Sequence, residues 1–160
     1  MYDYSEKKAA KALGARLTRG SGAVFDDADM RLAEFLIESK RRDNIGKKVI
    51  FYAAFWEKLK KQAVRTNRTP MYMWHTDGRC FVVTYLPVMV DVLQKEGRRI
   101  CTGDIKTTGT TNTIMAIEEF DAFHAWAYNK NMLPLMIFYY GKFEMALIDF
   151  ETFKNCMEAA

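Results

Sequence analysis

The sequence predicts an α/β fold in which a central mixed β-sheet is flanked by helices. Short apolar stretches typical of strands alternate along the chain with stretches whose apolar residues recur at helical spacing. The chain has 160 residues, about the size of one domain. Its 49% hydrophobic and 28% charged residues are typical of a globular protein with a sizeable core.

The N-terminal part supplies the first group of predicted elements. Residues 5–13 predict a helix, and "RGSGA" at 19–23 predicts a flexible turn between short extended pieces. Residues 30–40 predict an extended hairpin that bends near 32–34. Residues 55–65 carry Trp56, Leu59 and Ala63 on one stripe, so they predict an amphipathic helix.

A second hairpin and a helix follow. Asp77-Gly78 separates two apolar runs, 71–74 and 80–86, and this dipeptide is a strong signal for a tight turn between antiparallel strands. Pro87 then predicts the first turn of a helix that ends near Gln94.

The C-terminal part looks like a second copy of these elements, which predicts an internal repeat of about 65 residues. We therefore expect a core at 1–95 and a half-repeat at 96–160, packed on the same domain as a dimerisation or accessory part. Chance similarity between two aliphatic helix–strand–strand units is the alternative. The matched positions are Trp56-Glu57 and Phe120-Asp121, each 14 residues before a proline (Pro70 and Pro134), and Glu38-Ser39-Lys40 and Asp104-Ile105-Lys106. We interpret Asp104 and Lys106 as a degenerate or structural copy.

The net charge of +4 is unevenly distributed. Residues 1–68 hold 16 Lys and Arg against 9 Asp and Glu, whereas residues 69–160 hold 8 against 11. A basic field around a few carboxylates suits a polyanionic substrate that is cut with a divalent metal. A solvated basic face without a partner is the alternative.

Several protein classes fit the sequence poorly. Charges interrupt every apolar run before the roughly 18 residues that a membrane span needs, and the N-terminal residues lack the apolar stretch of a signal peptide. We therefore expect a cytoplasmic protein with no membrane partner. Three widely spaced cysteines and two histidines favour neither a disulfide framework nor a zinc site.

Asp29, Glu38 and Lys40 have the chemistry of a metal-dependent phosphodiesterase. Mg²⁺ held by hard oxygen ligands activates a water and stabilises developing negative charge, and a nearby ammonium helps to orient that water. Asp29 and Glu38 are the candidate ligands, and Lys40 is the candidate ammonium. Strand alternation puts Glu38 and Lys40 on one face. Asp26 or Asp27 could replace Asp29, and a plain ion pair between Glu38 and Lys40 is the structural alternative.

At these residues the sequence resembles the PD-(D/E)xK nuclease superfamily, and within it the Holliday junction resolvases of archaea and phages. The resemblance covers about residues 1–86. Ala28 stands where the family usually has a proline or glycine before the metal aspartate. The matching residues are Glu6, "RGSGA" at 19–23, Asp29-Met30-Arg31, "FLIESK" ending at Lys40, "WEKLKKQA" at 56–63 and "PMYMW" at 70–74.

The resemblance implies a restriction-endonuclease-like core and a homodimer that nicks two strands of a four-way DNA junction with Mg²⁺, for which Mn²⁺ can substitute. It implies Glu6 as a third catalytic and metal-binding carboxylate, although an acidic residue in a first helical turn is also ordinary. If the protein is phage-encoded, it would act in the host cytoplasm. The residues expected to contact DNA are Lys7, Lys11, Arg19, Ser21, Arg41, Arg42, Lys47 and Lys48.

Two other functions stay open at this point. One is a repair- or restriction-type endonuclease of the same superfamily that cuts flaps or duplex, and the other is a non-catalytic DNA-binding or assembly protein on the same scaffold. Gln62, on the helix predicted at 55–65, would either reach toward the site or lie in solvent.

Overall fold

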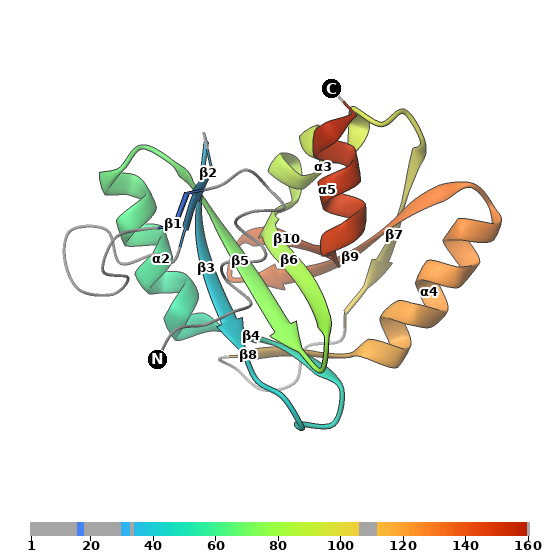
Figure 1. The fold of residues 1–160 in the computed structure, drawn as a ribbon, viewed down its shortest axis with the longest axis horizontal. Helices are drawn as coiled ribbons and strands as arrows, with labels where there is room; N and C mark the ends of the chain where they lie inside the picture. Colours follow the sequence, from blue (N-terminus) through green and yellow to red (C-terminus); the bar gives the residue numbers. More distant parts are fainter. Residues whose placement is uncertain (1–15, 18–29, 33, 106–111, 160) are drawn as a thin grey trace.

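The computed structural model of the protein describes residues 16–17, 30–32, 34–105 and 112–159 (Figure 1). The helices and strands of this part of the chain follow one another in the order β1 (Arg16–Leu17), β2 (Met30–Leu32), β3 (Phe35–Arg41), β4 (Lys48–Tyr52), α2 (Ala53–Arg65), β5 (Thr69–Thr76), β6 (Arg79–Tyr85), α3 (Leu86–Gln94), β7 (Arg99–Asp104), β8 (Asn112–Ala116), α4 (Ile117–Asn129), β9 (Met132–Tyr140), β10 (Phe143–Asp149) and α5 (Phe150–Glu158).

A mixed β-sheet forms the centre of the molecule, which confirms the predicted α/β class. Within the described residues its strand order is β1-β2-β3-β5-β6-β10-β9-β7, and β4 and β8 pair as a separate two-stranded sheet. The β3–β5 and β7–β9 pairs are parallel, whereas β5–β6, β6–β10 and β9–β10 are antiparallel.

Two apolar layers cover the central sheet, because its strands alternate two sets of buried side chains. Leu36 and Tyr72 pack with α2, α4 and the β4–β8 ribbon on one face. Phe35 and Ile37 pack with α3 and α5 on the other face. Figure 1 shows α2 and α4 far apart, while α3 and α5 lie side by side. No helix in the described ranges is long and apolar enough to cross a membrane.

Most elements predicted between residues 30 and 94 are confirmed. β2 and β3 form the hairpin expected at 30–40, and α2 and α3 are the expected helices. Asp77 and Gly78 both have positive φ, 45° and 79°, as the tight turn between β5 and β6 requires. The helix predicted at 5–13 and the turn at 19–23 lie outside the described residues.

Strands β4 and β8 were not predicted from the sequence. Each has five residues, and each pairs with a strand far away along the chain rather than with its neighbour. No turn signal therefore marks them as a pair.

The described chain folds as two copies of one unit, related by a pseudo-two-fold axis. Each copy runs strand, strand, helix, strand, strand, helix, first as β3-β4-α2-β5-β6-α3 and then as β7-β8-α4-β9-β10-α5. Val83 pairs with Leu147 across β6–β10, and Ile50 pairs with Ile114 across β4–β8. In both pairs the partners are 64 residues apart, so each residue faces its own counterpart and the axis passes through both pairs. We call these units the first and second repeat.

Strand register corrects one correspondence between the repeats. Glu38 pairs with Tyr72 in the first repeat, and Gly103 pairs with Met136, the counterpart of Tyr72, in the second. Gly103 is therefore the counterpart of Glu38, and Ile105 is the counterpart of Lys40. The match of Glu38 and Lys40 to Asp104 and Lys106 was wrong by one residue, a slip that exchanges the two faces of a strand.

Candidate active site

β3 presents Glu38 and Lys40 together on the face that α2 covers. The Lys40 Nζ lies 3.0 Å from Oε1 of Glu38, and the two strand neighbours of Glu38, Ile37 and Ser39, are both buried. The predicted shared face of Glu38 and Lys40 is confirmed. The strand is parallel to β5, so both side chains stand beside residues of a buried central strand.

The two charges differ in their access to solvent. The Glu38 side chain is 11% exposed, whereas the Lys40 side chain is 31% exposed. The Lys40 Nζ also lies 4.1 Å from the centre of the Phe55 ring at the start of α2, a cation–π contact. A carboxylate held away from water beside an ammonium has stronger electrostatic interactions than a surface pair. Glu38 is thus suited to bind a cation, and Lys40 can still reach a ligand in solvent.

Tyr72 stands beside Glu38 in the neighbouring strand. Burial raises the pKa of the Tyr72 hydroxyl well above its usual value, and the negative charge of Glu38 adds to that effect. The hydroxyl donates to the carbonyl oxygen of Ile50 at 3.0 Å. Tyr72 therefore stays protonated and ties β5 to β4 beside the carboxylate.

The backbone of β2 runs next to Glu38. Met30 pairs with Ile37, the residue that precedes Glu38. Asp29 itself lies outside the described residues, as do five other predicted site residues, namely Glu6, Lys7, Lys11, Arg19 and Ser21.

An exposed basic loop follows the Glu38–Lys40 pair. The predicted DNA contacts Arg41, Arg42, Lys47 and Lys48 are all exposed there. Asp43 joins this loop to the turn after β5, since its Oδ1 accepts the Asp77 N–H at 2.8 Å. That bond and the Arg41 guanidinium hold the pKa of the Asp43 carboxyl below its usual value. The loop is thus held at the end of β3, close to the candidate site.

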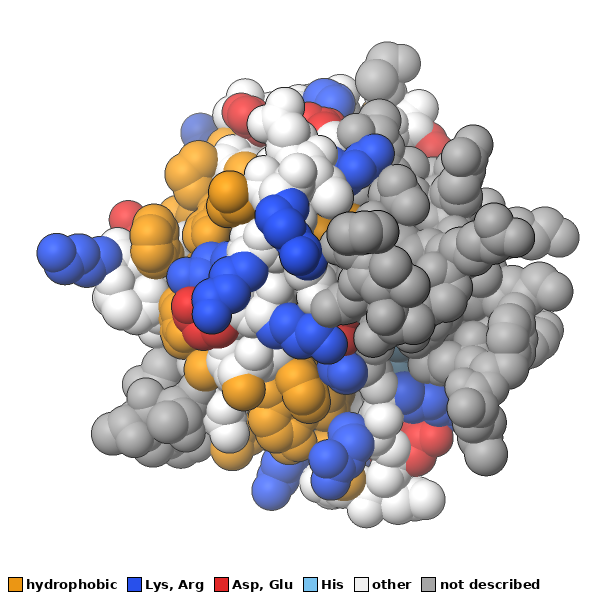
Figure 2. Space-filling view, turned by 90° about the vertical axis from the view of Figure 1, so that its left-hand side faces the viewer, with side chains coloured by type: hydrophobic (Ala, Val, Ile, Leu, Met, Phe, Trp, Pro, Cys, Tyr) orange, Lys and Arg blue, Asp and Glu red, His pale blue; other side chains and the backbone are white. Residues whose placement is uncertain are grey.

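The solvent side of α2 extends this basic surface. Helix α2 contains four Lys and Arg and one Glu, and its residues Lys58, Lys61 and Arg65 are exposed. Figure 2 shows Lys and Arg side chains gathered on this side of the molecule. We refer to the loop at 41–48 together with the exposed residues of α2 as the basic face.

Gln62 lies on the inner side of α2 and is 3% exposed, so the prediction that it lies in solvent was wrong. Phe55 and Tyr72 are two neighbours of the candidate site that were not identified from the sequence. Phe55 could have been found, because it starts the amphipathic helix that follows the predicted Lys40 strand. Tyr72 depends on the parallel pairing of β3 with β5, for which the sequence has no local signal.

The described residues of the second repeat form no comparable site at the matching position. A side chain at Gly103 would put its Cβ 3.1 Å from Sδ of Met136 and 3.3 Å from Cζ of Phe123. Ile105, at the Lys40 position, is 6% exposed. Apolar atoms therefore fill the space that Glu38 and Lys40 occupy in the first repeat.

Glu38 has the hard carboxylate oxygens that Mg²⁺ prefers. A full ligand set would need further carboxylates, since the described residues contain no group of three or more His, Cys, Asp or Glu that could hold a metal ion. Asp29 and Glu6, both beyond that part of the chain, are the candidates from the sequence.

A scan of the sequence against protein-family models found no match, and a search of curated proteins found none either. The resemblance to the PD-(D/E)xK nucleases therefore depends on the residues of the first repeat and its N-terminal extension, and it stays a prediction.

Proposed function

We propose that the protein is a Mg²⁺-dependent, structure-selective DNA endonuclease of the Holliday junction resolvase type, which hydrolyses phosphodiester bonds in branched DNA. The main support is the Glu38–Lys40 pair, held at 3.0 Å on one face of β3 directly before an exposed basic loop. Burying the Glu38 carboxylate costs desolvation free energy even when it is paired with Lys40, so stability alone does not explain the pair. The chemistry of the pair matches the needs of phosphodiester hydrolysis.

Each residue has a separate role in this proposal. Glu38, with Asp29 and Glu6, would hold Mg²⁺. When bound, the metal supplies Lewis acidity and lowers the pKa of a bound water. Lys40 directs its ammonium at the reacting phosphate and the water, while its packing on Phe55 fixes the direction of the side chain.

The basic face would collect the DNA backbone. Phosphate contacts carry no sequence information, so they suit an enzyme that selects DNA by shape. Arg41, Arg42, Lys47 and Lys48 lie next to the candidate site in the chain, which would bring a bound phosphate close to Glu38 and Lys40.

Single-turnover cleavage of a four-way junction tests the proposal. Glu38→Gln and Asp29→Asn keep the size of each side chain but remove a charged ligand, so cleavage should fall by about a hundredfold or more. Lys40→Ala should slow the chemical step while the metal still binds. Junction binding, measured separately in Ca²⁺, should survive in all three variants.

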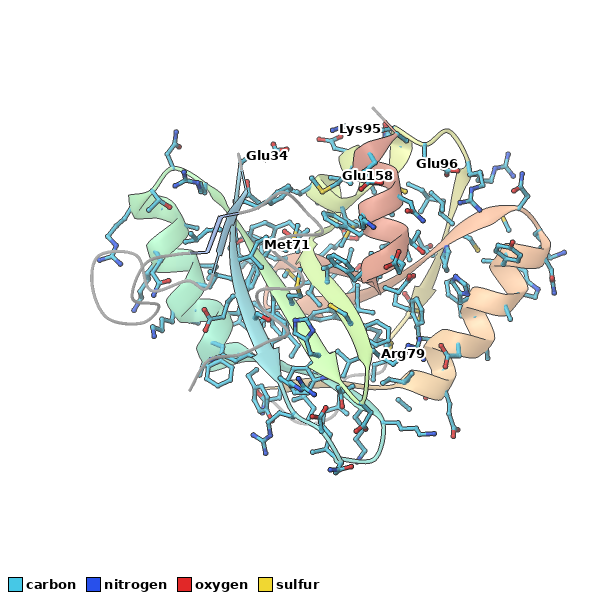
Figure 3. All side chains as sticks on the ribbon, in the orientation of Figure 1. Glu34, Met71, Arg79, Lys95, Glu96 and Glu158 are labelled. Atoms are coloured by element: carbon cyan, nitrogen blue, oxygen red, sulfur yellow. The ribbon has the colours of Figure 1, made fainter. Side chains whose placement is uncertain are left out.

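Matched controls come from the described part of the chain. Glu96→Gln changes another partly buried, ion-paired glutamate, whose Oε1 lies 2.7 Å from Nε of Arg98; Figure 3 shows Glu96 with Lys95 and Glu158 near the ends of α3 and α5. Lys130→Ala changes another lysine that lies over an aromatic ring, at 5.4 Å from the centre of Trp126. Both controls should cleave at the wild-type rate. Full activity of Glu38→Gln would disprove the site, and junction binding without cleavage by the wild type would favour a non-catalytic DNA-binding protein.

A further inference from the structure

We propose that one chain is the complete functional unit and that it cuts one DNA strand in each binding event. The second repeat takes the place of a second subunit in this proposal, but it lacks the catalytic pair. The inference depends on the nuclease function proposed above. It keeps the branched-DNA substrate but replaces the homodimer with two sites that the resemblance implies, so that resolving one four-way junction takes two binding events. Four observations on the two repeats support it.

The first observation is that each repeat supplies a hydrogen-bond acceptor for the first N–H group of a helix in the other repeat. The Ala53 N–H at the start of α2 donates to Oδ1 of Asn112 in β8, at 3.2 Å. The Ile117 N–H at the start of α4, the counterpart of Ala53, donates to the carbonyl oxygen of Lys47, at 3.0 Å. The first N–H groups of a helix have no partner inside the helix. Both helices therefore depend on the opposite repeat, as two subunits of an obligate dimer would.

The second observation is that carboxylates at matching positions of α2 and α4 each bind a side chain of the opposite repeat. Glu57 of α2 accepts the hydroxyl of Tyr140 at 2.6 Å. Asp121 of α4, the counterpart of Glu57, accepts two bonds from the Arg79 guanidinium at 2.8 and 3.1 Å. Figure 3 shows Arg79 at the end of the β5–β6 hairpin beside α4. Each carboxylate thus joins its helix to the opposite repeat.

The third observation is a shared apolar centre. The Phe51 ring lies 5.4 Å from Tyr72 of its own repeat and 5.1 Å from Phe138 of the other, measured between ring centres. Phe51, Tyr72 and Phe138 are buried in one continuous cluster with residues of both repeats. Neither repeat therefore has a separate core on this face of the sheet.

The fourth observation is that, at the described matching positions, the second repeat has neither the Glu–Lys pair nor the basic helix. Phe123 and Met136 fill the position of a carboxylate beside Gly103. Helix α4 has three acidic residues and no Lys or Arg, whereas α2 has four basic residues and one acidic residue. A phosphate backbone would be attracted to one repeat and repelled from the matching helix of the other. The symmetric scaffold thus offers DNA one catalytic side.

The chemical step on this site is a single hydrolysis. The oxygen of one water attacks one phosphorus, one P–O bond breaks, and the proton of that water goes to the leaving oxygen. One strand then carries a nick, with a phosphate on one end and a hydroxyl on the other. A second cut would require the site to dissociate and bind again.

A supercoiled plasmid with a cruciform-forming inverted repeat distinguishes one cut from two. The first nick relaxes the plasmid and removes the cruciform, so linear DNA forms only when two cuts occur in the lifetime of one complex. We expect nicked circles to be the product in Mg²⁺ at every protein concentration. Linear DNA as the main early product would overturn the inference but support the nuclease. No cleavage of any plasmid or junction would overturn the nuclease, and the inference with it.

A mixing experiment on the full chain gives a second test. Wild type and Glu38→Gln are mixed at constant total protein, above the concentration that saturates the junction. If one chain acts alone, the single-turnover amplitude should follow the wild-type fraction linearly, and sedimentation should show one chain of 18.6 kDa for each junction. Two chains for each junction, with a curved dependence on the wild-type fraction, would overturn the inference.

Discussion

The two repeats share a backbone plan but differ in chemistry. The first repeat carries Glu38, Lys40 and a basic helix. At the matching positions the second repeat has Gly103, Ile105 and an acidic helix. The positions nearest the pseudo-two-fold axis are apolar in both copies, as in the pairs Val83–Leu147 and Ile50–Ile114.

This difference follows from what each position has to do for folding. A residue on the axis packs against its own counterpart, so a polar replacement would be buried in the core that both repeats share. A residue on the solvent side of α2 or α4 has no such constraint. The scaffold can therefore keep its symmetry while one copy alone carries the charges of the proposed phosphodiesterase site at the described matching positions.

Phe51→Ala should give the largest effect on stability. Phe51 is 2% exposed and packs against rings from both repeats. Truncating a fully buried phenylalanine removes about 3–5 kcal/mol from the free energy of unfolding. Urea unfolding, followed by circular dichroism and by tryptophan fluorescence, should show one cooperative transition at a lower midpoint.

Met115→Ala is the matched variant, since Met115 is the counterpart of Phe51 and is 1% exposed. It should also lower the midpoint without splitting the transition. Two separate transitions in either variant would show that the repeats unfold independently, which the shared core argues against.

Gly103→Glu tests whether the second site can be restored. The new side chain would meet Met136 and Phe123 within 3.4 Å of its Cβ. Overpacking and a poorly solvated charge should together lower the free energy of unfolding by about 2–3 kcal/mol. Thr102→Glu, which adds the same side chain at an exposed neighbour, should have little effect. An equally stable Gly103→Glu protein would mean that the second repeat still has room for a carboxylate.

The fold was predictable where signals are local. Asp77-Gly78 fixed the β5–β6 turn, Pro87 marked the start of α3, and the apolar stripe of α2 was clear. The ribbon of β4 and β8 was missed, because each strand pairs with a strand of the other repeat, far away in the sequence. The internal repeat was recognised from prolines and helix residues, yet its strand register came from hydrogen bonding that the sequence does not display.

The candidate site shows the same limit. Alternation in "FLIESK" was enough to put Glu38 and Lys40 on one face of a strand. The sequence could not reveal that Tyr72 stands beside Glu38, or that Gly103 rather than Asp104 matches Glu38. Both depend on how a strand pairs with distant neighbours, and a shift of one residue moves every side chain to the other face.

The basic face should bind DNA more strongly than the matching acidic helix. Replacing Lys58, Lys61 and Arg65 by Gln should weaken every DNA substrate about tenfold to a hundredfold. The slope of log affinity against log salt should fall by about 0.9 for each phosphate that the protein no longer neutralises. The matched variant replaces Glu118 and Glu119 of α4 by Gln, and should bind as well as wild type or slightly better. Equal weakening of DNA binding in both variants would place DNA on both repeats and contradict the proposed difference between them.

Removing the hydrogen bond between Glu57 and Tyr140 should give the smallest change in stability, and this change should depend on pH. Glu57 is partly exposed, so Tyr140→Phe should lower the free energy of unfolding by about 1 kcal/mol at pH 7. The Tyr140 hydroxyl, followed by Lys60, holds the pKa of the Glu57 carboxyl below its usual value. A carboxyl group whose pKa is lower in the folded state stabilises the folded protein at pH values above its unfolded-state pKa. This stabilisation is lost as the pH falls through the folded-state pKa. The difference between wild type and Tyr140→Phe should therefore shrink below about pH 4.

The same pair predicts a second loss of stability at high pH. Burial, and then the hydrogen bond to Glu57, raise the pKa of Tyr140 to about 12. A hydroxyl whose pKa is higher in the folded state stabilises the folded protein at pH values below its unfolded-state pKa of about 10. This stabilisation disappears as the pH rises through the folded-state pKa. Urea unfolding at a series of pH values should thus give a difference that is largest between about pH 5 and 9. Tyr139→Phe is the matched control, because Tyr139 is 65% exposed on the same strand. A pH-independent difference for Tyr140→Phe would contradict the assignment of this stability to the hydrogen bond between the Tyr140 hydroxyl and Glu57.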